Sequence, residues 1–213
     1  MIVDERITAY INSLDQGNTK LLTQIEKEAH EDLVPVIRQE TQSLLRVLLG
    51  MLQPKNILEV GTAIGFSALF MSEYVSRDTK ITTIEKYEKR IPIAEENFRR
   101  AGREEQILFL KGDAADILKG LTGGYDFIFM DAAKGQYIHF LPDILRLLPS
   151  GGVLLSDNVL QDGDIIESRF AVERRNRTIH SRMREYLYVL THSPELTTSV
   201  LPVGDGITVS VKK

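Results

Sequence analysis

The chain has 213 residues, a formal net charge of −4 and no cysteine. This length suits one α/β domain with a substantial core, and the lack of cysteine excludes disulfides, thiolate metal ligands and a cysteine nucleophile. The acidic balance gives no overall nucleic-acid signature, so any such contact would depend on a local basic patch.

The N-terminal region, residues 1–52, is expected to be helical. It begins with acids where a signal peptide needs bases, and no apolar run in the chain approaches 18 residues, so we expect a cytoplasmic protein with no membrane partner. Apolar residues recur at helical spacing in three segments, 7–14, 21–29 and 41–49. Pro54 ends the last of these helices.

Residues 53–213 alternate between strand and helix patterns, which is typical of a parallel sheet with helices on both faces. The expected strands are 56–60, 80–85, 106–111, 125–131 and 151–157, with helical patterns at 65–77, 88–101 and 135–148. Residues 196–211 fit two further strands joined by a turn at 202–206. With no repeat or linker, we predict a single α/β domain over 1–213, with helices in 1–52 and a mostly parallel, seven-stranded, Rossmann-like core in 53–213.

The stretch 56–67 fits a buried strand, a tight turn and the start of a helix, which is where such folds receive a nucleotide-like cofactor. Gly61 is expected to let the chain turn, and Gly65 to let the helix start approach a ligand. The spacing is not that of a dinucleotide site, and Glu59 would repel a pyrophosphate but suit a cation. A purely structural strand–turn–helix joint is the alternative.

The second strand ends in Glu85, placed to accept hydrogen bonds from two ribose hydroxyls. Together these residues resemble the S-adenosylmethionine site of class I methyltransferases. Glu59, Gly61 and Gly65 match that family's first motif, E-x-G-x-x-x-G. Asp113 opens a short helix after the third strand, where it is expected to cap the helix, to lie near the adenine, or both.

Two further strand tips carry polar side chains. Asp131 follows one apolar strand with Lys134 close behind, and Asp157 and Asn158 follow the next. An all-oxygen set of this kind suits Mg²⁺, or another divalent cation such as Mn²⁺ or Ca²⁺. Asp157 and Asn158 can both face one metal only if the strand ends there, and any single tip acid, taken alone, is more readily a helix cap.

These tips and the ending Pro202–Gly206 resemble the cation-dependent O-methyltransferases of the catechol and caffeoyl-CoA type. The resemblance implies that Asp131, Asp157 and Asn158 bind the metal, and that Lys134 acts as the base, beside Asp131, near the accepting hydroxyl. It implies contacts to the cofactor from Ile37, Glu59, Gly61, Gly65, Ser67, Glu85, Asp113, Ala114 and Asp131.

A bacterial branch of that family, the tRNA 5-hydroxyuridine methyltransferases, is similar over 130–137 and 201–206. The stretch Arg169–Arg184 adds six arginines and one acid, a local charge of +5, which indicates either a solvated helix face or a surface that binds tRNA phosphates. We therefore expect methylation of wobble 5-hydroxyuridine in a tRNA anticodon loop. Catechol-like or caffeoyl-CoA-like acceptors, or a non-catalytic cofactor-binding module, are the alternatives. We also expect a homodimer.

Overall fold

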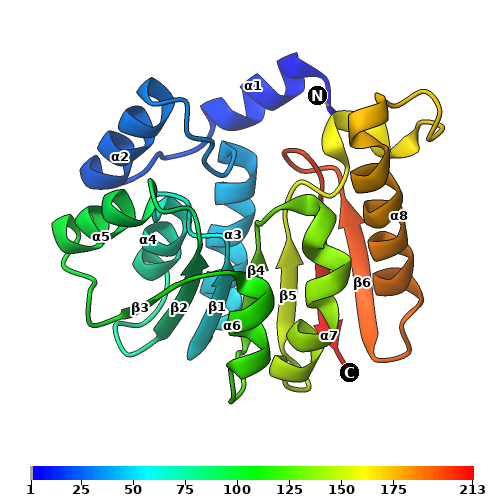
Figure 1. Cartoon of the computed structure of the whole chain (residues 1–213). Coiled ribbons are helices and arrows are strands. Elements are labelled where there is room, and N and C mark those ends of the chain that lie inside the picture. The colour runs from blue at the N-terminus through cyan, green and yellow to red at the C-terminus, as the bar shows by residue number, and fades with distance from the viewer. Residues whose placement is uncertain (1) are drawn as a thin grey trace.

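The computed structural model describes residues 2–213 and contains one seven-stranded sheet (Figure 1). The strands are β1 Asn56–Val60, β2 Lys80–Glu85, β3 Ile107–Lys111, β4 Phe127–Met130, β5 Val153–Ser156, β6 Leu196–Leu201 and β7 Ile207–Lys212. They lie in the order β3-β2-β1-β4-β5-β7-β6, with β1 to β5 parallel and β7 antiparallel to both β5 and β6. The mostly parallel, Rossmann-like sheet expected from the sequence is confirmed.

The strand order reverses between β1 and β4. The chain winds outward from β1 through β2 to β3 and then returns to β4 on the other side of β1. The last residues of β1, β4 and β5 pair with one another, so the residues that follow them, Gly61, Asp131 and Asp157, lie side by side. In open α/β sheets a crevice at such a reversal is where ligands bind.

Helices cover both faces of the sheet, as Figure 1 shows. One face packs against α2 Lys20–Glu31, α3 Gln39–Leu52, α4 Phe66–Glu73 and α5 Ile91–Arg100, and the other against α6 Ala114–Gly120, α7 Tyr137–Leu147 and α8 Arg177–His192. Successive side chains of a strand point to opposite faces. Accordingly, Phe127 and Phe129 of β4 join the first core, whereas Ile128 and Met130 join the second.

Helix α8 contains the second half of the arginine-rich stretch. Its buried residues, His180, Met183, Tyr186 and Leu190, recur every three or four positions and face the core. The arginines therefore lie on a helix with one apolar face, as the solvated-helix interpretation of this stretch expects from residue 177 onward.

Helix α1, Glu5–Ser13, has an unusual orientation. Its apolar side chains at Ile7, Tyr10 and Ile11 are all about half exposed or more, and none of its residues is buried. Polar contacts hold it instead, because the Asn12 side chain donates to Glu40 Oε1 (3.0 Å) on α3. The helix predicted from the apolar spacing is confirmed, but its apolar face does not enter this chain's core.

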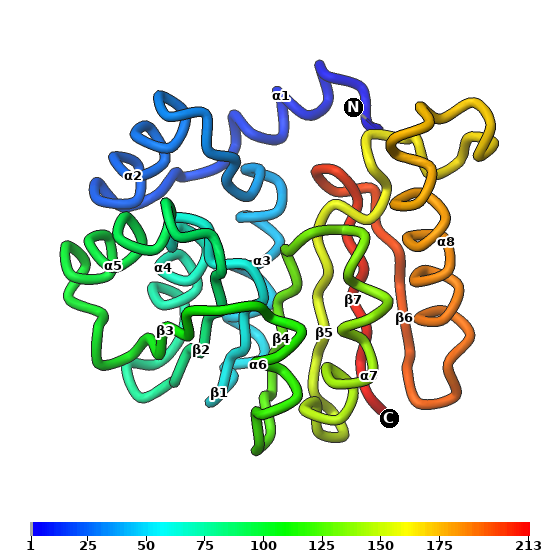
Figure 2. Tube along the Cα trace, in the orientation of Figure 1, coloured from blue at the N-terminus to red at the C-terminus, as the bar shows by residue number. Residues whose placement is uncertain are grey.

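The N-terminal end crosses over the carboxyl ends of the strands. Figure 2 shows α1 and the segment that follows β5 at the same end of the molecule. A Cβ on Gly163 in that segment would lie 3.8 Å from the Ile2 side chain, so the two pieces are close neighbours. Over residues 2–213 no helix combines the length and the apolar character needed to cross a membrane.

Candidate active site

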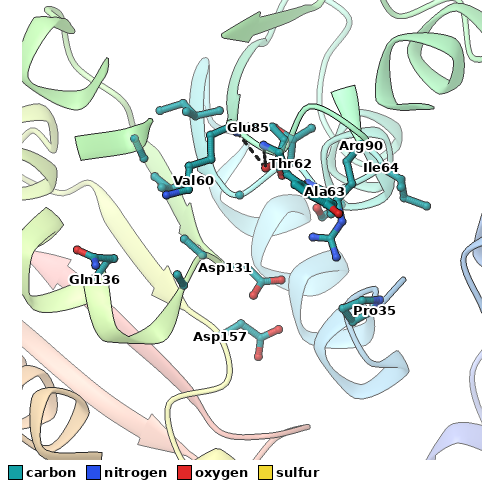
Figure 3. A pocket seen from close by; sticks show the side chains of 18 of the residues that line it. Pro35, Val60, Thr62, Ala63, Ile64, Glu85, Arg90, Asp131, Gln136 and Asp157 are labelled. Carbon is teal, nitrogen blue, oxygen red and sulfur yellow. Dashed lines mark hydrogen bonds between the residues drawn. The ribbon is translucent and has the colours of Figure 1, made fainter. Parts of the chain in front are cut away.

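A cavity of about 670 Å³ opens beyond the carboxyl ends of β1, β2, β4 and β5 (Figure 3). Cavities of this size accommodate small-molecule ligands. Of the predicted site residues, those that line it are Ile37, Gly61, Ser67, Glu85, Asp113, Ala114, Asp131, Lys134, Asp157 and Asn158. The structure therefore brings the two predicted halves, the cofactor residues and the metal residues, to one crevice.

Two predicted positions, Glu59 and Gly65, lie behind the cavity wall. Gly65 adopts a left-handed φ of +84°, and a Cβ there would lie 2.6 Å from the ring of Phe98 on α5. Gly65 does not line the cavity, so its expected close approach to a ligand stays a prediction. This glycine is required by its backbone conformation and by the packing of α5 against the start of α4.

Gly61 is also required by contacts within the protein. Its φ is +107°, and a Cβ would lie 2.0 Å from the carbonyl oxygen of Asp131. Any side chain here would push apart the ends of β1 and β4, the two strands that flank the point of reversal. Gly61 does line the cavity, but the tightest constraint on it is the neighbouring strand.

Glu59 is a fully buried carboxylate beneath this turn. Its Oε2 accepts a short hydrogen bond from the Thr83 hydroxyl, while its Oε1 has no hydrogen-bond partner among the described residues. Burial raises the pKa of Glu59 to about 7, against hydrogen bonds from Ser67 and Thr83 that lower it. A buried carboxylate without a counter-charge favours a cation nearby, consistent with the charge argument made from the sequence.

Glu85 and Asp113 mark the opposite end of the cavity. Glu85 accepts three backbone hydrogen bonds, from Ala63 to Oε2 (2.8 Å) and from Lys86 and Tyr87 to Oε1 (2.9 and 2.8 Å). These bonds fix the carboxylate at the tip of β2 and leave further lone pairs facing the cavity. Asp113 caps α6 by accepting from the Ala115 N–H (2.9 Å), so the cap interpretation is confirmed and does not exclude a ligand contact.

The segment 35–38 closes one side of the cavity. Ile37 is buried, and its carbonyl accepts from the Gln42 side chain (2.9 Å), which anchors the segment to α3. Arg38 also lines the cavity and forms an ion pair with Asp162 (3.1 Å), on the loop that follows β5. Arg38 carries no signal in the sequence, because a lone arginine before a helix belongs to no motif.

The two acidic strand tips lie together, and Figure 3 shows both carboxylates directed into the cavity. Strand β5 ends at Ser156 and Asn158 has a left-handed φ of +56°, so the chain turns as the metal hypothesis requires. Asp157 Oδ1 accepts from the Asn158 N–H (2.7 Å). All three side chains are therefore in reach of one crevice.

The electrostatics of this pair favour a bound cation. Burial raises the pKa of Asp131 and of Asp157, and the charge of Asp131 raises that of Asp157 further, whereas Lys134 lowers both. The buried Asp157 and the half-buried Asp131 have only Lys134 as a nearby positive charge among the groups that shift their pKa, and oxygen donors suit a hard divalent ion. Within residues 2–213 no three His, Cys, Asp or Glu side chains cluster to hold a metal, so any site here needs the Asn158 amide oxygen as well.

Lys134 lies in a short 3-10 turn, Lys134–Gln136, that follows β4. Its Nζ is 3.7 Å from Oδ2 of Asp205, which lies in the turn between β6 and β7 and is almost fully buried. Tyr137 supports the same tips, because its hydroxyl lies 3.1 Å from both the Met130 and the Asp157 carbonyl oxygens. Asp205 belonged to a motif noted in the sequence but received no role there.

The arginine stretch lies outside the cavity lining. No arginine between 169 and 184 lines it, and several are bound to backbone carbonyls: Arg182 to Gly135 (3.1 Å), Arg177 to Val172 (3.2 Å) and Arg184 to Ile165 (3.4 Å). Arg175 pairs with Glu173. Arg169 and Arg174 are exposed. The stretch mainly ties the loop after β5 and the Lys134 turn to α8.

Comparison with known proteins shows which family this chain is similar to. The family model described as O-methyltransferase matches residues 12–213. The chain is 33% identical over 175 residues to caffeoyl-CoA O-methyltransferase 2 of Populus trichocarpa, which covers 77% of this chain and 69% of that protein.

Solved structures of similar proteins superpose on almost the whole of this chain. A Staphylococcus aureus protein described as a candidate caffeoyl-CoA O-methyltransferase superposes with a TM-score of 0.90 at 31% identity, covering 99% of this chain and 100% of that one. The SAH-bound methyltransferase of Podospora anserina superposes with a TM-score of 0.88 at 28% identity, covering 98% and 94%.

Proposed function

Because this chain belongs to the O-methyltransferase family, it is an S-adenosylmethionine-dependent O-methyltransferase, and we propose that it methylates one of two neighbouring oxygens of its acceptor. The observation that carries the proposal is the meeting of Asp131, Asp157, Asn158 and Lys134 in the cavity that Glu85 also lines. A non-catalytic cofactor-binding module is not supported, since such a module has no use for these side chains.

The methyl donor would occupy the part of the cavity between β1 and β2. Glu85 is positioned to accept hydrogen bonds from the two ribose hydroxyls, and Asp113 and Ala114 adjoin the adenine. Gly61, Ser67 and Ile37 line the path toward the metal residues. The negative charge of Glu59 beneath the turn favours the positively charged methionyl end.

Asp131, Asp157 and Asn158 would hold a divalent cation such as Mg²⁺. When bound, the cation supplies a positive charge that lowers the pKa of the accepting hydroxyl and holds two acceptor oxygens in one orientation. Lys134 Nζ, in its neutral amine form, would accept the hydroxyl proton. The acceptor oxygen then forms a bond to the methyl carbon as the bond from that carbon to sulfur breaks, which yields a methyl ether and S-adenosylhomocysteine.

We propose that the acceptor is 5-hydroxyuridine at the wobble position of a tRNA. Its 5-hydroxyl and 4-carbonyl form the neighbouring oxygen pair that the metal residues require. The exposed Arg169 and Arg174, on the segment that follows β5, provide positive charge for phosphates on a chain of net charge −4, and Arg38 at the cavity wall adds a guanidinium that is already paired with Asp162. An enzyme acting on a base needs that base unstacked and inside a pocket, which an open cavity of this size allows.

A small catechol-like or caffeoyl-CoA-like acceptor is the second candidate. It is favoured by the names of the similar proteins, which include a caffeoyl-CoA O-methyltransferase at 33% identity. Such acceptors carry the same pair of neighbouring oxygens. The coenzyme A ester would also carry phosphates, so positive charge at the cavity wall does not separate the two candidates.

The test is a direct comparison of acceptors with the purified enzyme, S-adenosylmethionine and Mg²⁺. We expect tRNA containing 5-hydroxyuridine to yield 5-methoxyuridine, detected by mass spectrometry of the nucleosides, with an equal amount of S-adenosylhomocysteine. Catechol and caffeoyl-CoA are expected to react far more slowly. Efficient methylation of either small acceptor, with hydroxyuridine tRNA unchanged at low salt, would overturn the tRNA assignment.

We also propose that the enzyme is a cytoplasmic homodimer. The outward apolar side chains of α1, at Ile7, Tyr10 and Ile11, support a protein surface as its neighbour, since such faces are usually covered. Light scattering after gel filtration measures the mass directly, and a 24.1 kDa species at micromolar concentration contradicts the dimer.

A further inference from the structure

The turn between β6 and β7, residues 202–206, holds a carboxylate that the chemistry above does not use. Asp205 has a side chain only 7% exposed, yet its Oδ2 lies 3.7 Å from Nζ of Lys134. A buried carboxylate is expensive to keep unless it is paired or hydrogen-bonded. Asp205 satisfies that condition with both of its oxygens.

The second carboxylate oxygen of Asp205 binds the loop that follows Asp157 and Asn158. Asp205 Oδ1 accepts a short hydrogen bond from the Asp162 N–H, and the Asp205 carbonyl accepts from the Leu160 N–H (3.1 Å). The loop has left-handed backbone at Gln161 and Asp162, so it needs these bonds to keep its shape. One side chain therefore touches both the loop after Asp157 and the lysine after Asp131.

The geometry points to Asp205 as a positioning residue for Lys134, an inference that rests on the proposed role of Lys134 as the base. A base in a catalytic site is commonly oriented by a third group on the side away from the substrate. Asp205 Oδ2 forms an ion pair with Nζ at 3.7 Å and so attracts this nitrogen from the side of the β6–β7 turn, which leaves its other side facing the cavity. The 3.7 Å separation is longer than a hydrogen bond, as is common before a substrate closes such a site.

The arrangement also explains how the antiparallel end of the sheet serves the parallel half. Gly206, next to Asp205, has a φ of +87°, and a Cβ there would lie 2.3 Å from the Leu160 side chain. The turn thus packs directly on the loop after β5. This contact fixes Asp205 relative to Lys134 without any residue of β6 or β7 entering the cavity.

A double-mutant cycle tests this role. Asp205→Asn keeps an oxygen that can accept from the Asp162 N–H but removes the charge facing Lys134. We expect kcat to fall about tenfold, the effect of a modest misplacement of a catalytic group, with KM for both substrates changed less than about twofold. In the Lys134→Ala background the same change should have no further effect on kcat, because the group it positions is gone.

Two outcomes overturn the inference. The first is an Asp205→Asn enzyme with the kcat of wild type. The second is an equal loss of kcat with and without Lys134, because such a loss indicates a purely structural role. Glu31→Gln, which breaks an exposed ion pair with Lys27 on α2, away from the residues that line the cavity, is the matched control and should leave kcat unchanged. If Lys134→Ala itself has no effect, the proposed base is wrong, which is a distinct result.

Should Asp205→Asn fail to fold, Asp205→Glu replaces it in the same cycle. The longer side chain keeps the charge and both acceptor oxygens but displaces Nζ. A loss of kcat that disappears in the Lys134→Ala background supports the inference, and an equal kcat in both Asp and Glu enzymes overturns it.

Discussion

Glu59 is the residue whose chemistry departs furthest from its surroundings. Burial raises its pKa to about 7 from an ordinary value of 4.5, so between these pH values the folded state keeps a proton that the unfolded state has lost. Stability therefore falls as pH rises from about 4.5 to 7 and then stays reduced. The penalty at pH 8 is up to about 3 kcal/mol, from roughly 1.4 kcal/mol for each pKa unit.

Replacing this acid by a neutral isostere tests that penalty. Glu59→Gln should melt several degrees above wild type at pH 8 in the absence of ligand, and the difference should vanish near pH 4.5. The same variant should bind S-adenosylmethionine more weakly, because the charge beneath its cationic end is removed. Calorimetry at the two pH values measures both effects. Glu88→Gln, at an exposed position, is the control, and equal melting of Glu59→Gln and wild type at pH 8 contradicts the account.

Asp157 is repelled by the charge of Asp131, and a bound cation is expected to attract both carboxylates. Mg²⁺ should raise the melting temperature of wild type, since a ligand that binds only the folded state stabilises it. Asp157→Asn should lose most of this shift together with activity, while its affinity for S-adenosylmethionine stays near that of wild type. Scanning fluorimetry with and without Mg²⁺ shows the shift, and Asp116→Asn, an exposed acid of α6, should respond as wild type does. Full activity in excess chelator refutes the metal requirement.

At the scale of elements, the sequence predicts more about which pieces exist than about why particular residues occupy them. The alternation of apolar strands and helical patterns predicts the sheet, and the acids at strand tips predict the cavity, because both follow from local spacing. Gly65 was expected to face a ligand, but Phe98 of α5 fills that space. Asp205 faces Lys134 from 71 positions away (205 − 134), which no local pattern indicates.

Helix α1 is a second case in which the sequence predicts an element but not its contacts. Its apolar periodicity is correct, but the choice of inward face depends on the polar partners that α3 presents, including Glu40. By their spacing, the arginines of α8 fit either a solvated face or a phosphate-binding surface, and backbone carbonyls nearby bind three of them. In both helices tertiary contacts decide the direction, and spacing alone leaves it open.

The turn after β1 gives a prediction for two glycines with left-handed backbone. Gly61→Ala would place a Cβ 2.0 Å from the Asp131 carbonyl, whereas Gly102→Ala has nothing within 4 Å. Both changes incur the strain of a positive φ, about 1 to 2 kcal/mol. Only Gly61→Ala should also force β1 and β4 apart, so it should destabilise the fold by several kcal/mol and abolish binding of S-adenosylmethionine. Urea unfolding of the two variants compares them, and similar losses would rule out the clash.

For the whole molecule, the distribution of charge decides how an RNA acceptor could be held. The chain is acidic overall, but Arg169–Arg184 carries a local charge of +5. Backbone carbonyls or Glu173 bind Arg175, Arg177, Arg182 and Arg184, which leaves Arg169 and Arg174 as the exposed members best placed for phosphates. The segment comes after the loop that follows β5, and Figure 1 shows the start of α8 near the end of the sheet where the carboxyl ends of the parallel strands lie. A tRNA held there would lie across a short basic strip on a surface that otherwise repels it.

The salt dependence of kcat/KM for tRNA measures contacts between these arginines and phosphates. If two phosphates are neutralised, the double variant Arg169→Ala, Arg174→Ala should reduce the slope of log kcat/KM against log salt by about 1.4 for hydroxyuridine tRNA, at roughly 0.7 for each contact with a single strand. Methylation of a catechol at saturating concentration should be unaffected, because it makes no such contact. Arg99→Ala on α5, which breaks an exposed pair with Glu96, removes one charge away from the strip and should leave the slope unchanged. A double variant with the wild-type slope would show that the tRNA does not use this strip, and an equal loss in Arg99→Ala would show that only total charge matters.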